Sequence, residues 1–277
     1  MSPPKVAALR AQLRAGAVAA ADLVRPREHP AAAVVLAYHD IIDDDAAPFS
    51  YAVSLSRFRQ HLTMLARLRL TVVPLGDLSR RRITGQPLHG LVSIVFDDAL
   101  IGVHHLALPE LADRGWAATL LPVLDRLGMD PPWWPGSQRT MTRAELAETA
   151  AAGVTLAGHG STHACLVCLT APALRNELVS ARAGLTELGG RPVTELAYPF
   201  GHHDPRVRDA AQQAGYTTGY SFLNGRVGPA SPLLWLPRLT MHQGVGPARL
   251  RHQLARRGSD WPEAHRSPVH GPHAPAG

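Results

Sequence analysis

The chain has 277 residues and a formal net charge of +6, with 45% hydrophobic and 18% charged residues. This balance is typical of a globular protein and excludes a wholly disordered chain, and no apolar run approaches the ~18 residues that a membrane-spanning helix needs. The positive charge lies at the two ends, since residues 1–30 and residues 247–277 each carry five basic and two acidic side chains, and 31–246 is neutral. A nucleic-acid-binding stripe is therefore not expected.

The N-terminal segment, residues 1–30, is rich in alanine and arginine, and we expect it to form a helical extension. Its apolar stretch at 15–21 is interrupted by Asp22 after seven residues, at the short edge of the range for a signal peptide. The two cysteines of the chain are too few for a disulfide scaffold. These features favour a cytoplasmic protein, with secretion as the alternative.

Between residues 31 and 257, short apolar runs alternate with helical patterns, and we expect this stretch to be one domain. One helix begins at a capping box formed by Thr142 and Glu145. Strands followed by helices indicate a parallel α/β fold, and about eight strand candidates favour a barrel over a short open sheet. Residues 258–277 contain almost no large apolar side chain and are expected to be a disordered tail. The predicted strands are 33–37, 71–73, 92–96, 117–121, 154–157, 196–198, 217–220 and 235–241, and the predicted helices are 54–68, 142–151, 170–188 and 204–215.

Two adjacent carboxylates, Asp97 and Asp98, come directly after the predicted buried strand 92–96. Functional side chains in parallel α/β folds collect where strands end. Neighbouring side chains of a strand point to opposite sides, so we expect different roles, one carboxylate binding a metal and the other moving a proton. The alternative is that both are loop residues and that one caps the next helix.

Two histidines four residues apart, His159 and His163, follow the predicted strand 154–157. A helical turn would bring them onto one ion, and one carboxylate would complete a site that leaves positions open for water and substrate. The alternative is a pair of surface histidines in a chain that has 15. The combination with the Asp pair is more specific than either motif alone.

At these motifs the chain resembles the NodB-like polysaccharide deacetylases of carbohydrate esterase family 4, in the branch with an Ala-Tyr-Pro-x-Gly motif. The resemblance spans residues 33–243. It implies a distorted (β/α) barrel with about seven strands and metal-dependent hydrolysis of an N-acetyl group from an amino sugar. The matching segments, in family order, are 35–39, 95–98, 117–121, 158–163, 196–201 and 236–239.

The resemblance also implies a role for each residue in the motifs. Asp97 is the expected general base. Asp98, His159 and His163 are the expected ligands of one divalent ion, zinc in most members, with cobalt or nickel as alternatives. The backbone N–H of Phe200 is expected to help stabilise the oxyanion that forms on the acetyl group.

Three positions depart from the family pattern. Ala99 replaces the glycine that follows the Asp pair, and Ala164 stands where many members have proline. Ala197 stands where the family's usual arginine precedes the proline of the third motif. Arg238 is a candidate to hold Asp97 in place of that arginine, and a structural salt bridge is the alternative.

The acid that protonates the leaving amine is expected near the last strand, where His242 ends the segment 238–242. With a period of two, Arg238, Thr240 and His242 share one face, which would be the wet face in a barrel. The alternative is that His242 is a loop histidine. His39, after the first strand, is the second candidate for the acid, or it lines the substrate pocket.

Aromatic and imidazole side chains around the motifs are expected to meet the substrate. Trp133 and Trp134 lie in a long proline-rich loop, where they either form one wall of the substrate groove or pack into the core of the loop. Tyr198 is expected to contact the substrate. His202 and His203 follow the third motif and are further candidates for facing it.

Two cysteines lie close to the second histidine motif. Cys165 and Cys168 follow His163 by two and five residues. With His159 and His163 they have the ligand types of a structural zinc site, which is the less favoured alternative to the site with Asp98.

We therefore predict a metal-dependent hydrolase that removes an N-acetyl group from an amino sugar in a poly- or oligosaccharide. One alternative is a deacetylase of a small amino-sugar metabolite or a glycolipid precursor, which would suit a cytoplasmic enzyme. Another is a catalytically inactive carbohydrate-binding relative, suggested by Ala99 and the missing arginine. The sequence predicts a carbohydrate partner, no nucleic acid and no membrane span, and it identifies no protein partner.

Overall fold

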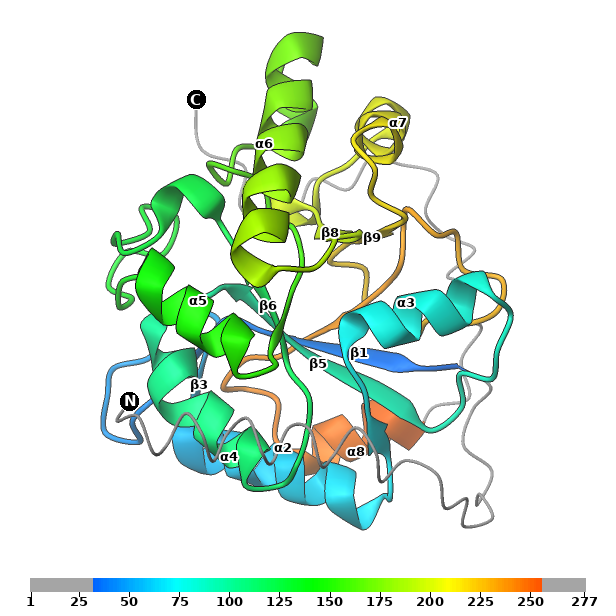
Figure 1. Cartoon of the computed structure of the whole chain (residues 1–277). Helices are drawn as coiled ribbons and strands as arrows, with labels where there is room; N and C mark the ends of the chain where they lie inside the picture. The colour runs from blue at the N-terminus through cyan, green and yellow to red at the C-terminus, as the bar shows by residue number, and fades with distance from the viewer. Residues whose placement is uncertain (1–31, 256–277) are drawn as a thin grey trace.

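A parallel sheet forms the centre of the protein in the computed structural model, which describes residues 32–255 (Figure 1). The helical extension and the tail predicted for 1–30 and 258–277 lie outside the described residues. The sheet runs in the order β10-β1-β5-β6-β7, and β4 pairs with the first residues of β5. Its strands are β1 (Val34–Tyr38), β4 (Thr71–Val72), β5 (Leu91–Asp98), β6 (Thr119–Pro122), β7 (Thr155–Leu156) and β10 (Leu239–Thr240).

Further pairings continue this sheet into a ring. The strands β8 (Glu195–Ala197) and β9 (Thr218–Tyr220) pair in parallel with each other. Single bridges join Gly158, just after β7, to Leu196 of β8, and Tyr220 of β9 to Leu236, just before β10. The order β1, β5, β6, β7, β8, β9, β10 therefore returns to β1, in agreement with the predicted distorted barrel. The very short strands β7 and β10 account for its irregularity.

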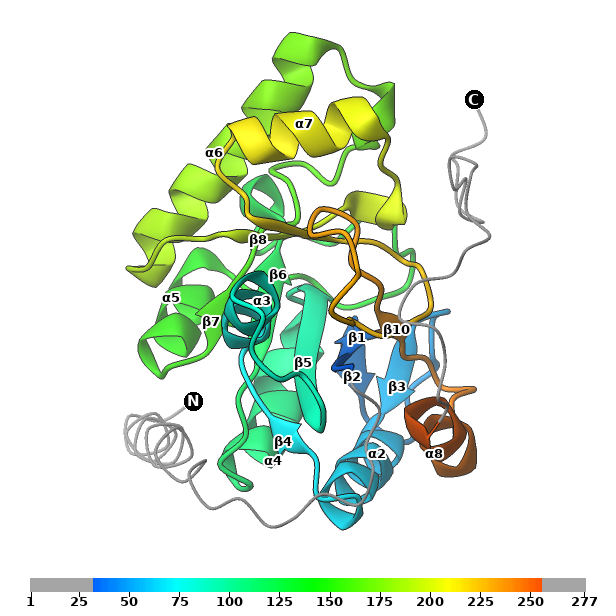
Figure 2. The same ribbon diagram turned by 90° about the vertical axis from the view of Figure 1, so that its right-hand side faces the viewer.

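Helices α6 and α7 lie on one side of this ring and α2, α4 and α8 on the other (Figures 1 and 2), whereas α3 contributes Leu75 and Leu78 to the apolar layer inside the ring. Three of the predicted helix starts are confirmed, because the side chains of Ser54, Thr142 and Asp204 cap the N-termini of the helices that follow them. The helices α3, α4 and α8 were not predicted, and neither was the parallel pair β2 (Asp40–Ile42) and β3 (Ala52–Ser54). The helices are α2 (Leu55–Arg67), α3 (Leu75–Ile83), α4 (Leu108–Ala112), α5 (Arg143–Ala151), α6 (Ala171–Gly189), α7 (Pro205–Gln213) and α8 (Pro247–Ala255).

Two apolar layers explain why β1 and β5 are continuous hydrophobic runs. Alternate side chains of a strand point to opposite faces, so one set fills the ring and the other packs under the helices. On β5, Val95 belongs to the inner layer, and Asp97 follows it on the same face. On β1, Ala37 belongs to the inner layer, and His39 follows it. The inner layer comprises Ala33, Val35, Ala37, Val95, Leu121, Ala157, Ala197, Tyr220 and Leu236, together with Leu75, Leu78, Leu88, Leu91 and Val227.

None of the helices within residues 32–255 is both long enough and apolar enough to cross a membrane.

Candidate active site

The candidate site lies at the carboxyl ends of the strands. Asp97 and Asp98 end β5, and His159 and His163 follow β7. The backbone is left-handed at Asp98 (φ 64°), His163 (φ 65°) and Phe200 (φ 58°), a conformation that side chains with a Cβ adopt at a cost of about 1–2 kcal/mol each. Such strain persists where the surrounding structure enforces it, and it is concentrated at functional sites.

The residue after the Asp pair, Ala99, shares this backbone conformation. Its φ is 52° and its side chain is fully buried. The left-handed turn explains why the resembling family has glycine there, because glycine adopts a positive φ without steric cost. Here the turn forms with alanine, so this departure from the family pattern leaves the geometry of the Asp pair in place.

Asp98, His159 and His163 meet in one buried group. The Asp98 Oδ1 atom lies 3.4 Å from His163 Nε2 and 3.6 Å from His159 Nε2, and the three candidate ligand atoms lie within 4.8 Å of one another. His159 Nδ1 lies 2.9 Å from the carbonyl oxygen of Ala197, and donation of its hydrogen there leaves the Nε2 lone pair facing Asp98. The loop from His159 to His163 is not helical, so the two rings converge through its bends instead of the helical turn expected from their spacing.

This group fits a divalent metal ion. Asp98 Oδ1 is buried without a hydrogen-bond partner among the described residues, although it faces two imidazole nitrogens. An unpaired buried carboxylate oxygen is costly, and a cation between the three side chains removes that cost. Two imidazoles and one carboxylate are borderline ligands that suit zinc, cobalt or nickel and leave coordination positions open.

The alternative zinc site with two cysteines is not formed. Within residues 32–255 the metal-capable group contains neither thiol. Cys165 Sγ lies 3.9 Å from His202 Nδ1, and Cys168 is exposed. Burial and the neighbouring Cys168 raise the pKa of the Cys165 thiol to about 11, so its environment does not favour the thiolate that a zinc ligand requires.

Asp97 pairs with Arg238 at the mouth of the ring. The Arg238 guanidinium is fully buried, and its Nη1 donates to Asp97 Oδ1 at 2.7 Å while its Nε donates to the carbonyl of Ser221. Burial alone would raise the pKa of Asp97, but Arg238, His159 and His39 together lower it to about 2. Asp97 is thus an ionised carboxylate held by an arginine that directly precedes β10 instead of one at position 197.

His39 lies on the other side of Asp97. Its Nε2 is 3.9 Å from Asp97 Oδ2, and its Nδ1 is buried without a hydrogen-bond partner among the described residues. Burial lowers the pKa of His39, while Asp97 and Asp98 act to raise it. Three aromatic rings surround the imidazole, at centroid distances of 4.9 Å for Tyr51, 5.2 Å for Trp134 and 6.0 Å for Phe222.

His242 is placed differently from the sequence-based expectation. Leu239 and Met241 are buried in the outer apolar layer and Arg238 faces Asp97, as a period of two predicts. However, β10 ends at Thr240, so the strand period no longer directs the side chain of His242. Its Nδ1 accepts a hydrogen bond from the N–H of Gly244, and no contact described within residues 32–255 joins it to Asp97 or the metal-capable group.

Both tryptophans of the proline-rich loop reach the site. Trp133 stacks on His163 with a centroid distance of 4.1 Å and an angle of 10° between the rings. Phe200 meets the edge of His163 at 4.5 Å. The Nε1–H of Trp134 donates to Asp98 Oδ2 at 2.6 Å. The loop therefore contributes to the site and does not only fill its own core.

Tyr198 is more deeply buried than a substrate contact leads one to expect, and Tyr51 and Phe222 add two residues to the site. Tyr198 is fully buried and its hydroxyl donates to the carbonyl of Leu234, so the contacts that the structure gives it support the fold. Tyr51 and Phe222, whose rings contact His39, come from segments without any recognisable motif. No local pattern marks them, because only the tertiary fold brings their segments to the mouth of the ring.

His202 and His203 differ in their surroundings. His202 lies near Phe200, at a centroid distance of 5.9 Å, and near Cys165. His203 packs against Tyr198 and accepts a hydrogen bond from Arg208, away from the Asp pair. Burial lowers the pKa of His203 to about 4, with Arg208 acting in the same direction. A neutral, arginine-bonded imidazole is unsuited to protonating a leaving amine.

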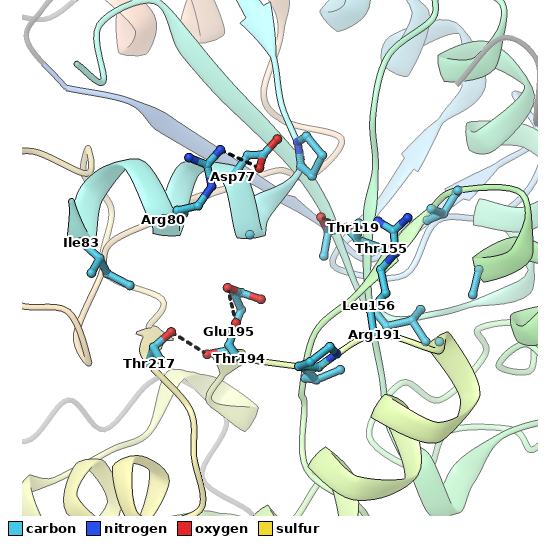
Figure 3. A pocket seen from close by; sticks show the side chains of 18 residues that line it. Asp77, Arg80, Ile83, Thr119, Thr155, Leu156, Arg191, Thr194, Glu195 and Thr217 are labelled. Atoms are coloured by element: carbon cyan, nitrogen blue, oxygen red, sulfur yellow. Dashed lines mark hydrogen bonds and ion pairs between the residues drawn. The ribbon is translucent and has the colours of Figure 1, made fainter. Parts of the chain in front are cut away.

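A separate cavity of about 470 Å³ lies at the opposite end of the ring (Figure 3). Its walls include Thr119, Thr155 and Glu195, which begin β6, β7 and β8, whereas the candidate site lies at the carboxyl ends of the strands. The buried Glu195 carboxylate accepts a hydrogen bond from the hydroxyl of Thr194 and faces Gly76 in the first turn of α3. A carboxylate at a helix N-terminus stabilises the helix. We therefore assign this cavity to the amino ends of the strands, where conserved features of such rings serve stability instead of catalysis.

Comparisons with known proteins agree with the fold described above. The sequence model of the family described as polysaccharide deacetylase matches residues 84–219. No curated protein matches the chain by sequence. Solved structures share its fold, among them a deacetylase of Streptococcus pyogenes in complex with acetate, which is 20% identical, with a TM-score of 0.71 over 81% of this chain and 99% of the other.

Two further structures have similar folds. A polysaccharide deacetylase from Bacillus cereus is 21% identical, with a TM-score of 0.68 over 80% of this chain and 69% of the other. IcaB from Ammonifex degensii is 19% identical, with a TM-score of 0.68 over 82% of this chain and 99% of the other. These likenesses confirm the α/β fold with a parallel sheet expected from the motifs.

Proposed function

The chain belongs to the polysaccharide deacetylase family, and from this premise we propose that it is a metal-dependent hydrolase that removes an N-acetyl group from an amino sugar. The observation that carries the proposal is the buried Asp98–His159–His163 group beside an ionised Asp97. A metal-capable set next to a carboxylate base is what amide hydrolysis by water requires. A divalent ion held by Asp98, His159 and His163 would lower the pKa of a water molecule and polarise the acetyl carbonyl.

The side chains around this group have the other roles in the proposed reaction. Asp97 takes a proton from the water that attacks the acetyl carbon, and Arg238 keeps the carboxylate ionised and oriented. The backbone N–H of Phe200 stabilises the developing oxyanion. As the carbon–nitrogen bond breaks, an acid gives its proton to the nitrogen, because an expelled amide anion is too basic. The products are acetate and the free amine.

We assign the acid to His39 instead of His242. His39 lies 3.9 Å from Asp97 on the same inward face, while His242 is beyond the end of β10. Burial lowers the pKa of His39 below its usual value, and the nearby carboxylates of Asp97 and Asp98 oppose this shift by favouring the protonated imidazole that an acid needs, so the assignment rests on the position of His39 beside Asp97.

Replacing His39 with asparagine should lower turnover by ~10²-fold or more while zinc binding persists, because a positioned acid contributes ~10²–10⁴-fold. The acid must be protonated, so the parent rate should fall as the pH rises through its pKa, and this fall should vanish or move in His39→Asn. The measurement is acetate release across pH. His242→Asn is the matched control and should keep the parent basic limb. If His242→Asn instead loses that limb and His39→Asn keeps it, His242 is the acid after all.

The aromatic side chains favour a carbohydrate substrate. Trp133 and Phe200 lie on the His163 side of the site, and Tyr51, Trp134 and Phe222 on the His39 side. Sugar rings stack on such apolar faces. The name of the Bacillus cereus structure and the family description both support a poly- or oligosaccharide.

The location of the enzyme bears on the length of its substrate. We propose that it acts in the cytoplasm. A cytoplasmic enzyme meets small amino-sugar metabolites and glycolipid precursors instead of wall polymers. Two observations support an active enzyme over the inactive alternative: Arg238 bonds to Asp97 although position 197 is alanine, and Ala99 adopts the glycine-like turn.

Acetate release from a panel of N-acetylated compounds tests the proposal. The panel holds β-linked N-acetylglucosamine oligomers, single N-acetylated amino sugars and an N-acetylglucosaminyl lipid. We expect the zinc-loaded protein to release acetate from at least one class and the chelator-treated protein to release none. Turnover of the oligomers alone would favour a polymer substrate outside the cytoplasm, and turnover of the small compounds a cytoplasmic one. Equal rates with and without metal would refute the metal-dependent mechanism.

A further inference from the structure

The carboxylate of Asp98 has two oxygens with different partners. Its Oδ1 faces His163 Nε2 and His159 Nε2, at 3.4 Å and 3.6 Å. Its Oδ2 accepts the 2.6 Å hydrogen bond from the indole Nε1 of Trp134. The indole therefore bonds to one oxygen of the carboxylate while the two imidazoles face the other, and the carboxylate cannot rotate without breaking the indole bond.

We propose that Trp134 is a positioning residue for the metal, acting through Asp98. Its N–H occupies Oδ2, so that Asp98 offers the ion one oxygen instead of two, and it keeps that oxygen between the two histidines. The inference rests on one part of the proposed function, the metal site, and does not depend on the substrate or the reaction.

The position of Asp98 makes such a partner necessary. The residue is fully buried, and its backbone is left-handed at the end of β5, where the regular direction of strand side chains is lost. A short hydrogen bond to a carboxylate is charge-assisted and roughly twice as strong as a neutral one. Partners of this kind orient metal ligands, and their removal costs ~10–100-fold in metal affinity.

The indole is itself held in place by packing. Its ring lies 5.2 Å from His39, 5.3 Å from Phe49 and 5.1 Å from Tyr51, measured between centroids. A ring confined on these sides presents its N–H in one direction. The same contacts connect the Asp98 carboxylate to the proposed acid His39, because the indole and that imidazole pack in a T-shaped arrangement with 87° between their planes.

The neighbouring tryptophan provides a matched control. Trp133 also touches a metal-capable residue, since it stacks on His163, but its Nε1 is buried without a hydrogen-bond partner among the described residues. Trp133 and Trp134 are adjacent in the same loop, but only the indole N–H of Trp134 bonds to a proposed metal ligand. Replacement by phenylalanine retains an aromatic ring in each and removes the N–H.

The test is zinc affinity, measured without substrate by competition with a chelator. We expect Trp134→Phe to bind zinc ~10–100-fold more weakly than the parent protein. Trp133→Phe should stay within a few-fold of the parent, because its N–H bonds to no ligand. In the Co²⁺-loaded protein, Trp134→Phe should also change the visible spectrum, because a freed Oδ2 lets Asp98 bind through both oxygens, and Trp133→Phe should keep the parent spectrum.

Parent-like zinc affinity and an unchanged cobalt spectrum in Trp134→Phe would overturn the inference, as would equal losses in the two variants. If Trp134→Phe fails to fold, site-specific incorporation of benzothienylalanine at position 134 replaces the N–H by sulfur and preserves the shape of the ring. Failure of the parent protein to bind zinc through Asp98 would instead overturn the proposed function, so the two failures are distinguishable.

Discussion

Replacing Asp97 with asparagine should leave zinc binding intact and reduce acetate release by ~10²-fold or more. Asp97 lies outside the metal-capable group, and its Oδ1 is held by Arg238. Asparagine keeps an oxygen that can accept the arginine hydrogen bond, but it cannot take a proton from water. The measurement pairs metal content with steady-state turnover on the most active compound of the panel.

Thermal unfolding supplies the control for this variant. Removing the charge of Asp97 leaves the buried Arg238 guanidinium facing a neutral amide, which lowers stability, so turnover must be compared well below the unfolding temperature. Loss of zinc from Asp97→Asn would mean that Asp97 binds the ion. Turnover close to that of the parent would mean that another group is the base.

Alanine at Asp98, His159 or His163 should sharply weaken zinc binding and abolish measurable turnover. Loss of an outer partner already costs ~10–100-fold in affinity, and loss of a ligand should cost more. The three side chains are buried together and form the metal-capable group found within residues 32–255. Metal content after dialysis and acetate release, measured on the same preparations, check the result.

The matched control for the ligand variants is Cys165→Ser combined with Cys168→Ser. The thiols lie next to the histidine motif in the sequence but outside the metal-capable group, so the double variant should retain the zinc of the parent protein. If the double variant loses zinc while His159→Ala retains it, the metal site contains the cysteines and the present assignment is wrong.

Sequence patterns predicted those elements whose stability depends on residues that are close together in the chain. The capping box of Thr142 and Glu145 acts within one helical turn, and both of its hydrogen bonds are present. The apolar run before Asp97 predicted a buried strand, because a strand enclosed by side chains on both faces is apolar at every position. Helix α3 was missed because its N-cap residue, Pro74, forms no side-chain cap and because the helix carries a run of arginines.

The sequence by itself determined the alternation of strands and helices, the Asp pair at a strand end and the two histidines, since each depends on neighbours a few residues away. Only the tertiary structure decided that Arg238 reaches Asp97, that His39 and not His242 stands beside it, and that the indole of Trp134 holds Asp98. Those contacts depend on which strands are neighbours in the ring and on where each strand ends, and both are set by pairings between distant segments. A period of two therefore predicted the direction of Arg238 but could not predict that of His242, because the strand had already ended.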